Sequence, residues 1–364
     1  MFASNIDGKN TASKLYKAPC FLVIIDAKTR RFLFVKRVKQ IKPWVIAIAL
    51  LCIAFAGCSA RVSENTVRSP DDLSFESKTV PVQILTDDLD RRIRVPTRIH
   101  RAVSLAPSVT ESVFAVGAGD RLVGVTTFCN YPEEAKSIQK VGDTLNPNIE
   151  TIVALKPDIV FVSSASQLES FMNTLEKNGI TVYVMNPDSF TGILHNLEQL
   201  GIMFGTIEQT KKLTDDLFQR ELLVRRKLGP HPAADESQAD YDKRVGPVKV
   251  FVQISKEPLF TIGKDAFLND LLLSAGGRSV TENVPSAFPK LSKETALALQ
   301  PDAIILSDSA DNQEPNEAFK NSPAEKKGRI YKINADIISR PGPRLIDALE
   351  QIAKFLHPDK FPDR

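Results

Sequence analysis

One stretch decides the fold, Glu150-Thr-Ile-Val-Ala-Leu-Lys-Pro-Asp-Ile-Val-Phe-Val-Ser163, and it returns 144 residues later as Glu294-Thr-Ala-Leu-Ala-Leu-Gln-Pro-Asp-Ala-Ile-Ile-Leu-Ser307. Each copy predicts a helix that ends at its proline, because the ring cannot continue the hydrogen-bond ladder. The apolar run that follows is typical of a strand buried on both faces. Chance similarity between two ordinary helix–strand turns is the alternative. The repeat favours two lobes of similar topology.

Strands and helices alternate on both sides of the two copies. The expected strands are 101–106, 122–127, 159–163, 181–185, 248–253, 303–306 and 330–333. The expected helices between them are 109–116, 149–155, 168–178, 266–274, 293–299 and 342–355. Such alternation indicates βαβ units and parallel sheets. The sequence therefore predicts an α/β protein with an N-terminal lobe at 98–188 and a C-terminal lobe at 248–364.

The segment between the lobes has a different pattern. Apolar residues recur at helical spacing through 189–228, with Gly201 and Gly205 as candidate kinks. This pattern predicts one long helix that bridges the lobes. The Pro-, Ala- and Asp-rich segment 229–247 predicts a surface loop.

The N-terminal region resembles an export signal. Basic residues precede an apolar run at 44–55, which is too short to span a bilayer comfortably. The run ends in Phe55-Ala-Gly-Cys58-Ser59, which resembles the lipobox of bacterial lipoproteins, in which the cysteine is diacylated. We therefore expect a signal at 1–57, over-long at its start with Val38 as a candidate initiator, and a lipidated tether at 58–97. An ordinary cleaved signal and a membrane anchor are the alternatives.

Charge and cysteine content differ across Cys58. Residues 1–57 hold 10 of the 47 Lys and Arg but only 2 of the 44 Asp and Glu. The rest of the chain therefore has 37 basic and 42 acidic residues, a net charge of about −5. An acidic mature chain argues against nucleic-acid binding. Cys129 is the only cysteine after Cys58, so no disulfide within the chain is expected despite export.

The sequence contains no motif that indicates catalysis or a metal ion bound by protein side chains. The four histidines, His100, His195, His231 and His357, have no second ligand at metal-binding spacing. No Gly-x-Ser-x-Gly elbow or phosphate-binding loop occurs. We therefore expect no catalytic residue, no metal site and no cofactor.

A binding cleft between the lobes is the remaining expectation, because small-ligand sites favour domain interfaces. Aromatic side chains with a few polar groups suit a large, partly apolar ligand, and an arginine suits a carboxylate or phosphate on it. For each aromatic residue taken singly, packing in the core is the alternative. The candidate lining residues are Phe128, Tyr131, Asn146, Ser163, Ser164, Phe260, Thr261, Phe288 and Arg340.

Several motifs identify a family resemblance. Val103-Ser-Leu-Ala-Pro-Ser-Val-Thr-Glu111, Gly117-Ala-Gly-Asp-Arg-Leu-Val-Gly-Val125 and Arg340-Pro-Gly-Pro-Arg344 resemble the receptors of ABC importers for cobalamin and iron–siderophores. The resemblance covers almost all of 98–358. It implies a class III periplasmic binding protein, in which two Rossmann-like α/β lobes are joined by a single long bridging helix. It also implies a monomer outside the cytoplasm, in the periplasm or on the outer face of the membrane, that serves a permease and its ATPase.

The resemblance also carries residue roles. Members dock onto the permease through one acidic residue on each lobe, and Glu150 matches the first. The second position of the vitamin B12 receptors is taken here by Ser339, so Asp347 or Glu350 would have to substitute.

A corrinoid is the first expectation for the ligand, although the tryptophans of those receptors are missing: the only Trp is Trp44. Phe128 and Phe288 fall at two aromatic positions of the family. A ferric siderophore or haem is the alternative metal chelate. An exported enzyme and a sensor domain are alternatives of another class.

Overall fold

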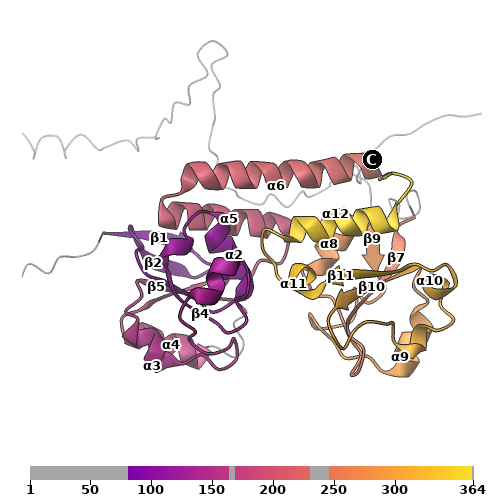
Figure 1. The fold of residues 1–364 in the computed structure, drawn as a ribbon, viewed down its shortest axis with the longest axis horizontal. Coiled ribbons are helices and arrows are strands. Elements are labelled where there is room, and N and C mark those ends of the chain that lie inside the picture. Colours follow the sequence, from indigo (N-terminus) through magenta and orange to yellow (C-terminus); the bar gives the residue numbers. More distant parts are fainter. Residues whose placement is uncertain (1–80, 164–168, 230–245, 363–364) are drawn as a thin grey trace, which may run out of the picture. The chain divides into compact units, whose positions relative to one another are not determined.

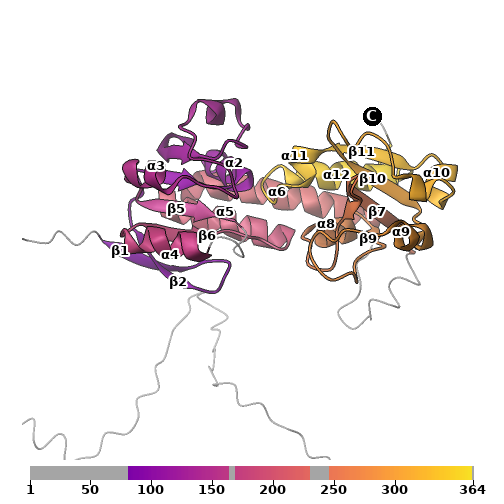
Figure 2. The ribbon, with the colours of Figure 1, turned by 90° about the horizontal axis from the view of Figure 1, so that it is seen from below.

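The computed structural model describes residues 81–163, 169–229 and 246–362, all within one compact unit, Ser77–Arg364. The signal, Cys58, Ser164 and nearly all of the expected loop 229–247 lie outside the described residues. Two α/β lobes stand side by side within this unit (Figures 1 and 2). None of the helices described there is long and apolar enough to cross a bilayer.

A four-stranded parallel sheet in the order β4-β3-β5-β6 forms the centre of the first lobe. Its strands are β3 (Ala102–Ser104), β4 (Leu122–Val125), β5 (Ile159–Val162) and β6 (Thr181–Val184). Its helices are α2 (Pro107–Ala115), α3 (Ile149–Ala154) and α4 (Glu169–Lys177), with short 3₁₀ turns at Gly119–Arg121 and Glu133–Ser137. All four residues of β5 are buried, as its apolar run predicted.

A β-hairpin precedes this sheet and corrects the expected tether. β1 (Val82–Thr86) pairs antiparallel with β2 (Arg92–Pro96). The turn between them is bonded to β6 and to the helix that follows it, α5 (Phe190–Phe204), since Asp87 accepts the Val184 N–H at 3.3 Å and Asp88 accepts the Asn196 side-chain N–H at 2.7 Å. Residues 82–96 therefore belong to the folded lobe, and the expectation of a tether through residue 97 is wrong.

The second lobe contains a mixed sheet in the order β11-β10-β7-β8, with β9 also paired to β7. The strands are β7 (Val248–Ser255), β8 (Phe260–Thr261), β9 (Gly277–Ser279), β10 (Ala303–Asp308) and β11 (Ile330–Asn334). The helices are α8 (Leu268–Ser274), α9 (Lys293–Leu299), α10 (Pro323–Lys326), α11 (Ala335–Ile338) and α12 (Leu345–Leu356), with a 3₁₀ turn at Glu317–Phe319. β8 pairs antiparallel with β7, so this lobe is only partly parallel.

The two copies of the repeat have the same structure. Lys156 and Gln300, which precede the prolines, have φ of 46° and 43°, the left-handed conformation in which helices commonly end. The next aspartate then holds the start of the neighbouring strand. Asp158 accepts the Arg101 N–H at 2.9 Å, and Asp302 accepts the Lys249 N–H at 3.4 Å. The Pro-Asp turn thus sets the register of each sheet.

The expected single helix at 189–228 is wrong. α5 (Phe190–Phe204) ends at Gly205, whose φ of 72° closes the helix, and α6 (Ile207–Leu228) begins two residues later. The two helices pack on each other as a hairpin. A Cβ at Gly201 would lie 2.5 Å from Thr210 Oγ1, so the glycine permits this close approach.

α6 is the element that reaches both lobes. It packs on α5 and also contacts α8 and α12 of the second lobe, and Figure 1 shows it running across both lobes. The start of α5 is also tied to the second lobe, because Asp270 of α8 accepts the Phe190 N–H at 2.9 Å. Two helices, rather than one, therefore connect the lobes.

Candidate ligand cleft

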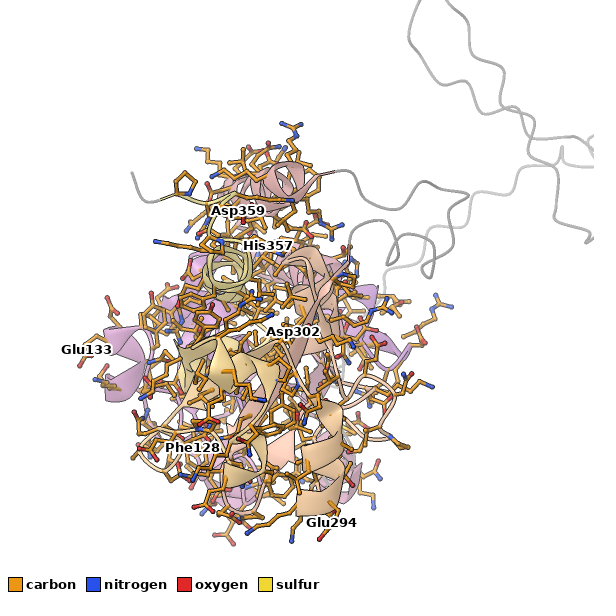
Figure 3. All side chains as sticks on the ribbon, turned by 90° about the vertical axis from the view of Figure 1, so that its right-hand side faces the viewer. Phe128, Glu133, Glu294, Asp302, His357 and Asp359 are labelled. Carbon is orange, nitrogen blue, oxygen red and sulfur yellow. The ribbon has the colours of Figure 1, made fainter. Side chains whose placement is uncertain are left out.

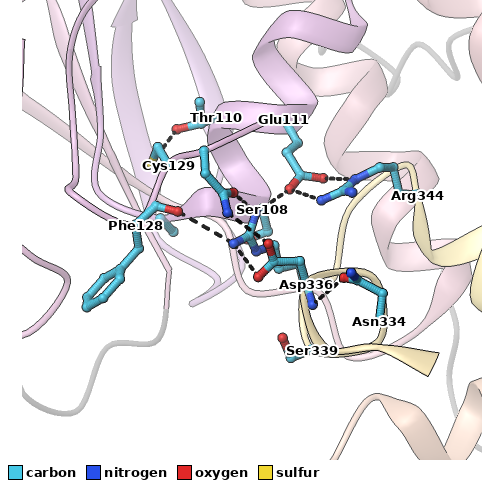
Figure 4. A network of polar contacts seen from close by, with 12 residues as sticks. Ser108, Thr110, Glu111, Phe128, Cys129, Asn334, Asp336, Ser339 and Arg344 are labelled. Atoms are coloured by element: carbon cyan, nitrogen blue, oxygen red, sulfur yellow. Dashed lines mark hydrogen bonds and ion pairs between the residues drawn. The ribbon is translucent and has the colours of Figure 1, made fainter. Parts of the chain in front are cut away.

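The carboxyl ends of the parallel strands carry the candidate cleft residues. β4 leads into the segment 126–132, which holds Phe128 and Tyr131, and β11 leads into α11 and the loop with Arg340. Ligands of open α/β sheets bind at such strand ends. Side chains from the two lobes meet here in a polar network, which Figure 4 shows from close by.

Glu111 of α2 is the centre of this network. Its side chain is only 2% exposed and accepts N–H bonds from Arg340 at 2.8 Å and from Arg344 at 2.8 and 2.6 Å. These bonds raise the pKa of Arg344, because the neighbouring carboxylate stabilises its cationic form. A carboxylate as buried as this needs its cationic partners, since burial without them is strongly unfavourable.

The arginines make further contacts across the lobes. Arg340 donates to the Asn130 side-chain oxygen at 2.8 Å and to Asp336 at 2.6 Å. Asn130 in turn donates to Asp336 at 2.9 Å, and the Arg344 guanidinium lies 3.9 Å from the centre of the Tyr131 ring. Arg340, predicted as a ligand contact, is 11% exposed and is engaged within the protein instead.

Three of the candidate aromatic residues are exposed. Phe128, Tyr131 and Phe288 are 58%, 46% and 44% exposed, so packing in the core does not account for them. The Phe128 ring points away from the ion network (Figure 4). Phe260 is half-buried.

The polar candidate residues differ in burial and in hydrogen bonding. Thr261 is fully buried and its hydroxyl donates to the Val252 carbonyl at 2.7 Å, so its prediction as a lining residue is wrong. Ser163 follows β5 and is half-buried. Asn146 is exposed in a turn where its backbone N–H donates to Asp143 at 2.6 Å, and this bond lowers the pKa of Asp143. The neighbouring Leu145, which the sequence did not single out, is the most exposed large apolar residue described.

The repeat places two acidic residues alike. Glu150 and Glu294 both lie exposed in the first turns of α3 and α9, after the capping residues Asn148 and Ser292. The Glu294 pKa is lowered by its own backbone N–H and by the Ser292 hydroxyl. α3 and α9 lie on the side opposite α6 (Figure 1), and Figure 3 shows Glu294 at the end away from His357.

The expected substitutes for the second docking acid lie elsewhere. Asp347 and Glu350 of α12 pair with Arg220 of α6 at 2.6 and 2.7 Å, on the α6 side of the unit. Ser339 has its hydroxyl bonded to the Ala335 carbonyl. Glu294, which the internal repeat aligns with Glu150, was not singled out as a docking residue from the sequence.

A small cavity lies behind the network, lined by Ser108, Val109, Ser112, Met185, Pro187, Ile193, Asn196 and Pro341. Its volume of about 10 Å³ holds at most one water molecule. Among the described residues, no group of three His, Cys, Asp or Glu side chains could hold a metal ion.

Two α/β lobes that meet where β4 and β11 end, with the exposed rings of Phe128 and Tyr131 beside the junction, define the fold of a two-lobed ligand-binding protein. The sequence matches the family described as periplasmic binding protein over residues 103–337, and the chain belongs to this family. The resemblance stated from the motifs is thereby confirmed.

Several relatives support this assignment. The chain is 30% identical to an uncharacterized ABC transporter substrate-binding lipoprotein, YvrC of Bacillus subtilis, over 87% of this chain and 97% of that one. It is 28% identical to a vitamin B12-binding protein of Vibrio parahaemolyticus, over 70% and 89%. The crystal structure of the vitamin B12-binding protein BtuF of Vibrio cholerae matches with a TM-score of 0.63 and 27% identity, over 74% and 100%. These relatives are binding proteins, so the expectation that the chain is no enzyme is confirmed.

Proposed function

We propose that this chain is the extracytoplasmic receptor of an ABC importer, which captures a corrinoid between its lobes and delivers it to the permease and its ATPase. The observation that carries the ligand class is the character of the strand-end residues. Phe128, Tyr131 and Phe288 offer exposed aromatic surface, whereas Arg340 and Arg344 are both engaged by Glu111.

This combination favours a large ligand with little net charge over an anionic one. Aromatic rings cover apolar surface well, and an anionic ligand would need a cation that is not already paired. Haem and many ferric siderophores carry carboxylates or other anionic groups. The vitamin B12-binding relatives support the same choice, although the missing tryptophans reduce the aromatic area that this chain can offer.

Glu150 and Glu294 are the proposed contacts with the permease. They occupy equivalent positions in the two copies of the repeat, in the first turns of α3 and α9, and both helices lie on the side opposite α6 (Figure 1). The bonds that lower the pKa of Glu294 favour its charged form at neutral pH. Two carboxylates on one side, one from each lobe, would recognise two basic pockets on a symmetric partner.

Attachment to the membrane through lipid on Cys58 completes the proposal. A tethered receptor stays at high effective concentration near its permease. Two acyl chains hold a protein stably at a membrane, whereas one holds it only marginally.

A competitive titration tests the ligand class. The purified chain would be titrated by calorimetry with cyanocobalamin, cobinamide, haemin and a ferric hydroxamate siderophore. We expect binding of the two corrinoids at micromolar concentrations or below. Preferred binding of haemin or the siderophore would contradict the corrinoid proposal and support the alternative chelates. Binding of none of the four would contradict the receptor proposal for this ligand group.

A further inference from the structure

The interlobe clamp, which we define as Glu111, Asn130, Asp336, Arg340 and Arg344, joins the lobes where the ligand is proposed to bind. Glu111 and Asn130 belong to the first lobe, and the other three belong to the second. Arg340 and Arg344 together donate three bonds to the buried Glu111 carboxylate. The clamp therefore centres on a buried carboxylate with several hydrogen bonds, unlike an exposed ion pair on the surface.

Backbone packing supports the same junction independently. A Cβ at Gly342, between the two arginines, would lie 3.3 Å from the Ser108 carbonyl oxygen of α2. The loop of the second lobe thus lies directly against the start of α2. The two lobes are therefore in close backbone contact beside the charged side chains.

The clamp also reaches the segment 126–132, which carries the exposed aromatic residues. Arg340 donates to Asn130 and lies 3.5 Å from the Phe128 carbonyl oxygen, and Arg344 stacks on the Tyr131 ring. Three of the seven residues in this segment are therefore held by arginines of the other lobe. Bonds within the first lobe, such as Thr127 N–H to the Gly142 carbonyl at 2.9 Å, restrain the rest.

We propose that Arg340 and Arg344 are positioning residues, which fix Phe128 and Tyr131 relative to the second lobe instead of binding the ligand themselves. This inference rests on the proposed ligand-binding role of the two aromatic residues. A ligand carboxylate that displaced Glu111 from either arginine would leave this buried carboxylate with fewer cationic partners, which is unfavourable. The clamp therefore fixes the distance between these aromatic residues and the second lobe before a ligand binds.

Two variants and one matched control test the clamp. Glu111→Gln keeps the shape of the side chain and removes its charge. Arg344→Lys keeps the charge and removes the planar fork that bonds Glu111 and stacks on Tyr131. Arg220→Lys is the control, because Arg220 also donates three bonds to carboxylates, Asp347 and Glu350, but on the α6 side.

Amide hydrogen exchange of the unliganded full-length chain gives the first measurement. We expect exchange in 126–132 to become about tenfold faster in both variants, as loss of a charge-assisted hydrogen bond implies, and to stay unchanged in the control. Unchanged exchange in both variants, or an equal change in Arg220→Lys, would overturn the clamp. If Glu111→Gln does not fold, Arg344→Lys decides.

Calorimetric titration with cyanocobalamin gives the second measurement. We expect the dissociation constant to rise about tenfold in the clamp variants and not in the control. Faster exchange with unchanged affinity would overturn the positioning role and leave a purely structural contact. If the wild-type chain binds no cyanocobalamin, the ligand proposal fails, and the exchange measurement still decides whether the clamp holds the segment.

Discussion

Replacing Phe128 by alanine is predicted to weaken ligand binding while leaving the fold intact. The side chain is 58% exposed in the unliganded protein and makes little contribution to the core. A phenylalanine side chain buries roughly 200 Å² when fully covered, so about 120 Å² of Phe128 is available to a ligand. At about 25 cal/mol/Å², complete coverage would contribute about 3 kcal/mol and half coverage about 1.5 kcal/mol.

The expected result is a dissociation constant for cyanocobalamin that rises by about 10- to 100-fold, measured by calorimetry. The free energy of unfolding should change by less than about 0.5 kcal/mol, because an exposed side chain is removed. Phe218→Ala is the matched control: Phe218 is 47% exposed but lies on α6. Unchanged affinity in Phe128→Ala, or an equal loss in Phe218→Ala, would refute the aromatic cleft.

Three further predictions follow from other parts of the chain. Glu150→Arg combined with Glu294→Arg should abolish cobalamin uptake by cells that depend on the chain, while the cobalamin affinity of the chain stays unchanged. Asp215→Arg on α6 is the control. Undiminished uptake in the double variant would contradict the docking proposal. Gly201→Val should lower the free energy of unfolding in urea by about 1–3 kcal/mol, because the new side chain meets Thr210, whereas Ile202→Ala on the exposed side of α5 should change it far less. Cys58→Ala should prevent incorporation of labelled fatty acid and move the protein from the membrane to the soluble fraction; a labelled variant would exclude Cys58 as the lipid site.

The regular part of the fold could be predicted because its signals are local. β5 is apolar throughout and β10 is apolar from Ala303 to Leu306, and the proline before each strand marks where the preceding helix ends. The break between α5 and α6 was less visible in the sequence, because a helix can tolerate a glycine. The left-handed conformation of Gly205, which shows that the chain reverses there, is seen only in the structure. The hairpin of β1 and β2 was missed because it depends on contacts about a hundred residues away in sequence, from Asp87 to Val184 of β6 and from Asp88 to Asn196 of α5.

The sequence indicated which residue types could line a cleft but not their surroundings. Phe128, Tyr131 and Phe288 are exposed, whereas Thr261 is a core residue. Arg340 was expected to contact a ligand, and the structure shows it bonded to Glu111. Its bond to Glu111 joins residues 229 positions apart, and no spacing rule connects them. Glu294, by contrast, could have been found, because the repeat that indicated two lobes also aligned it with Glu150.

The most direct measurement of the central claim is amide hydrogen exchange of the wild-type chain with and without saturating cyanocobalamin. The account predicts slower exchange in both lobes at once, in 126–132 after β4 and in 284–290 around Phe288, with no change in the outer part of α6. Protection confined to one lobe, or protection of α6 alone, would contradict the claim that the ligand is held between the lobes.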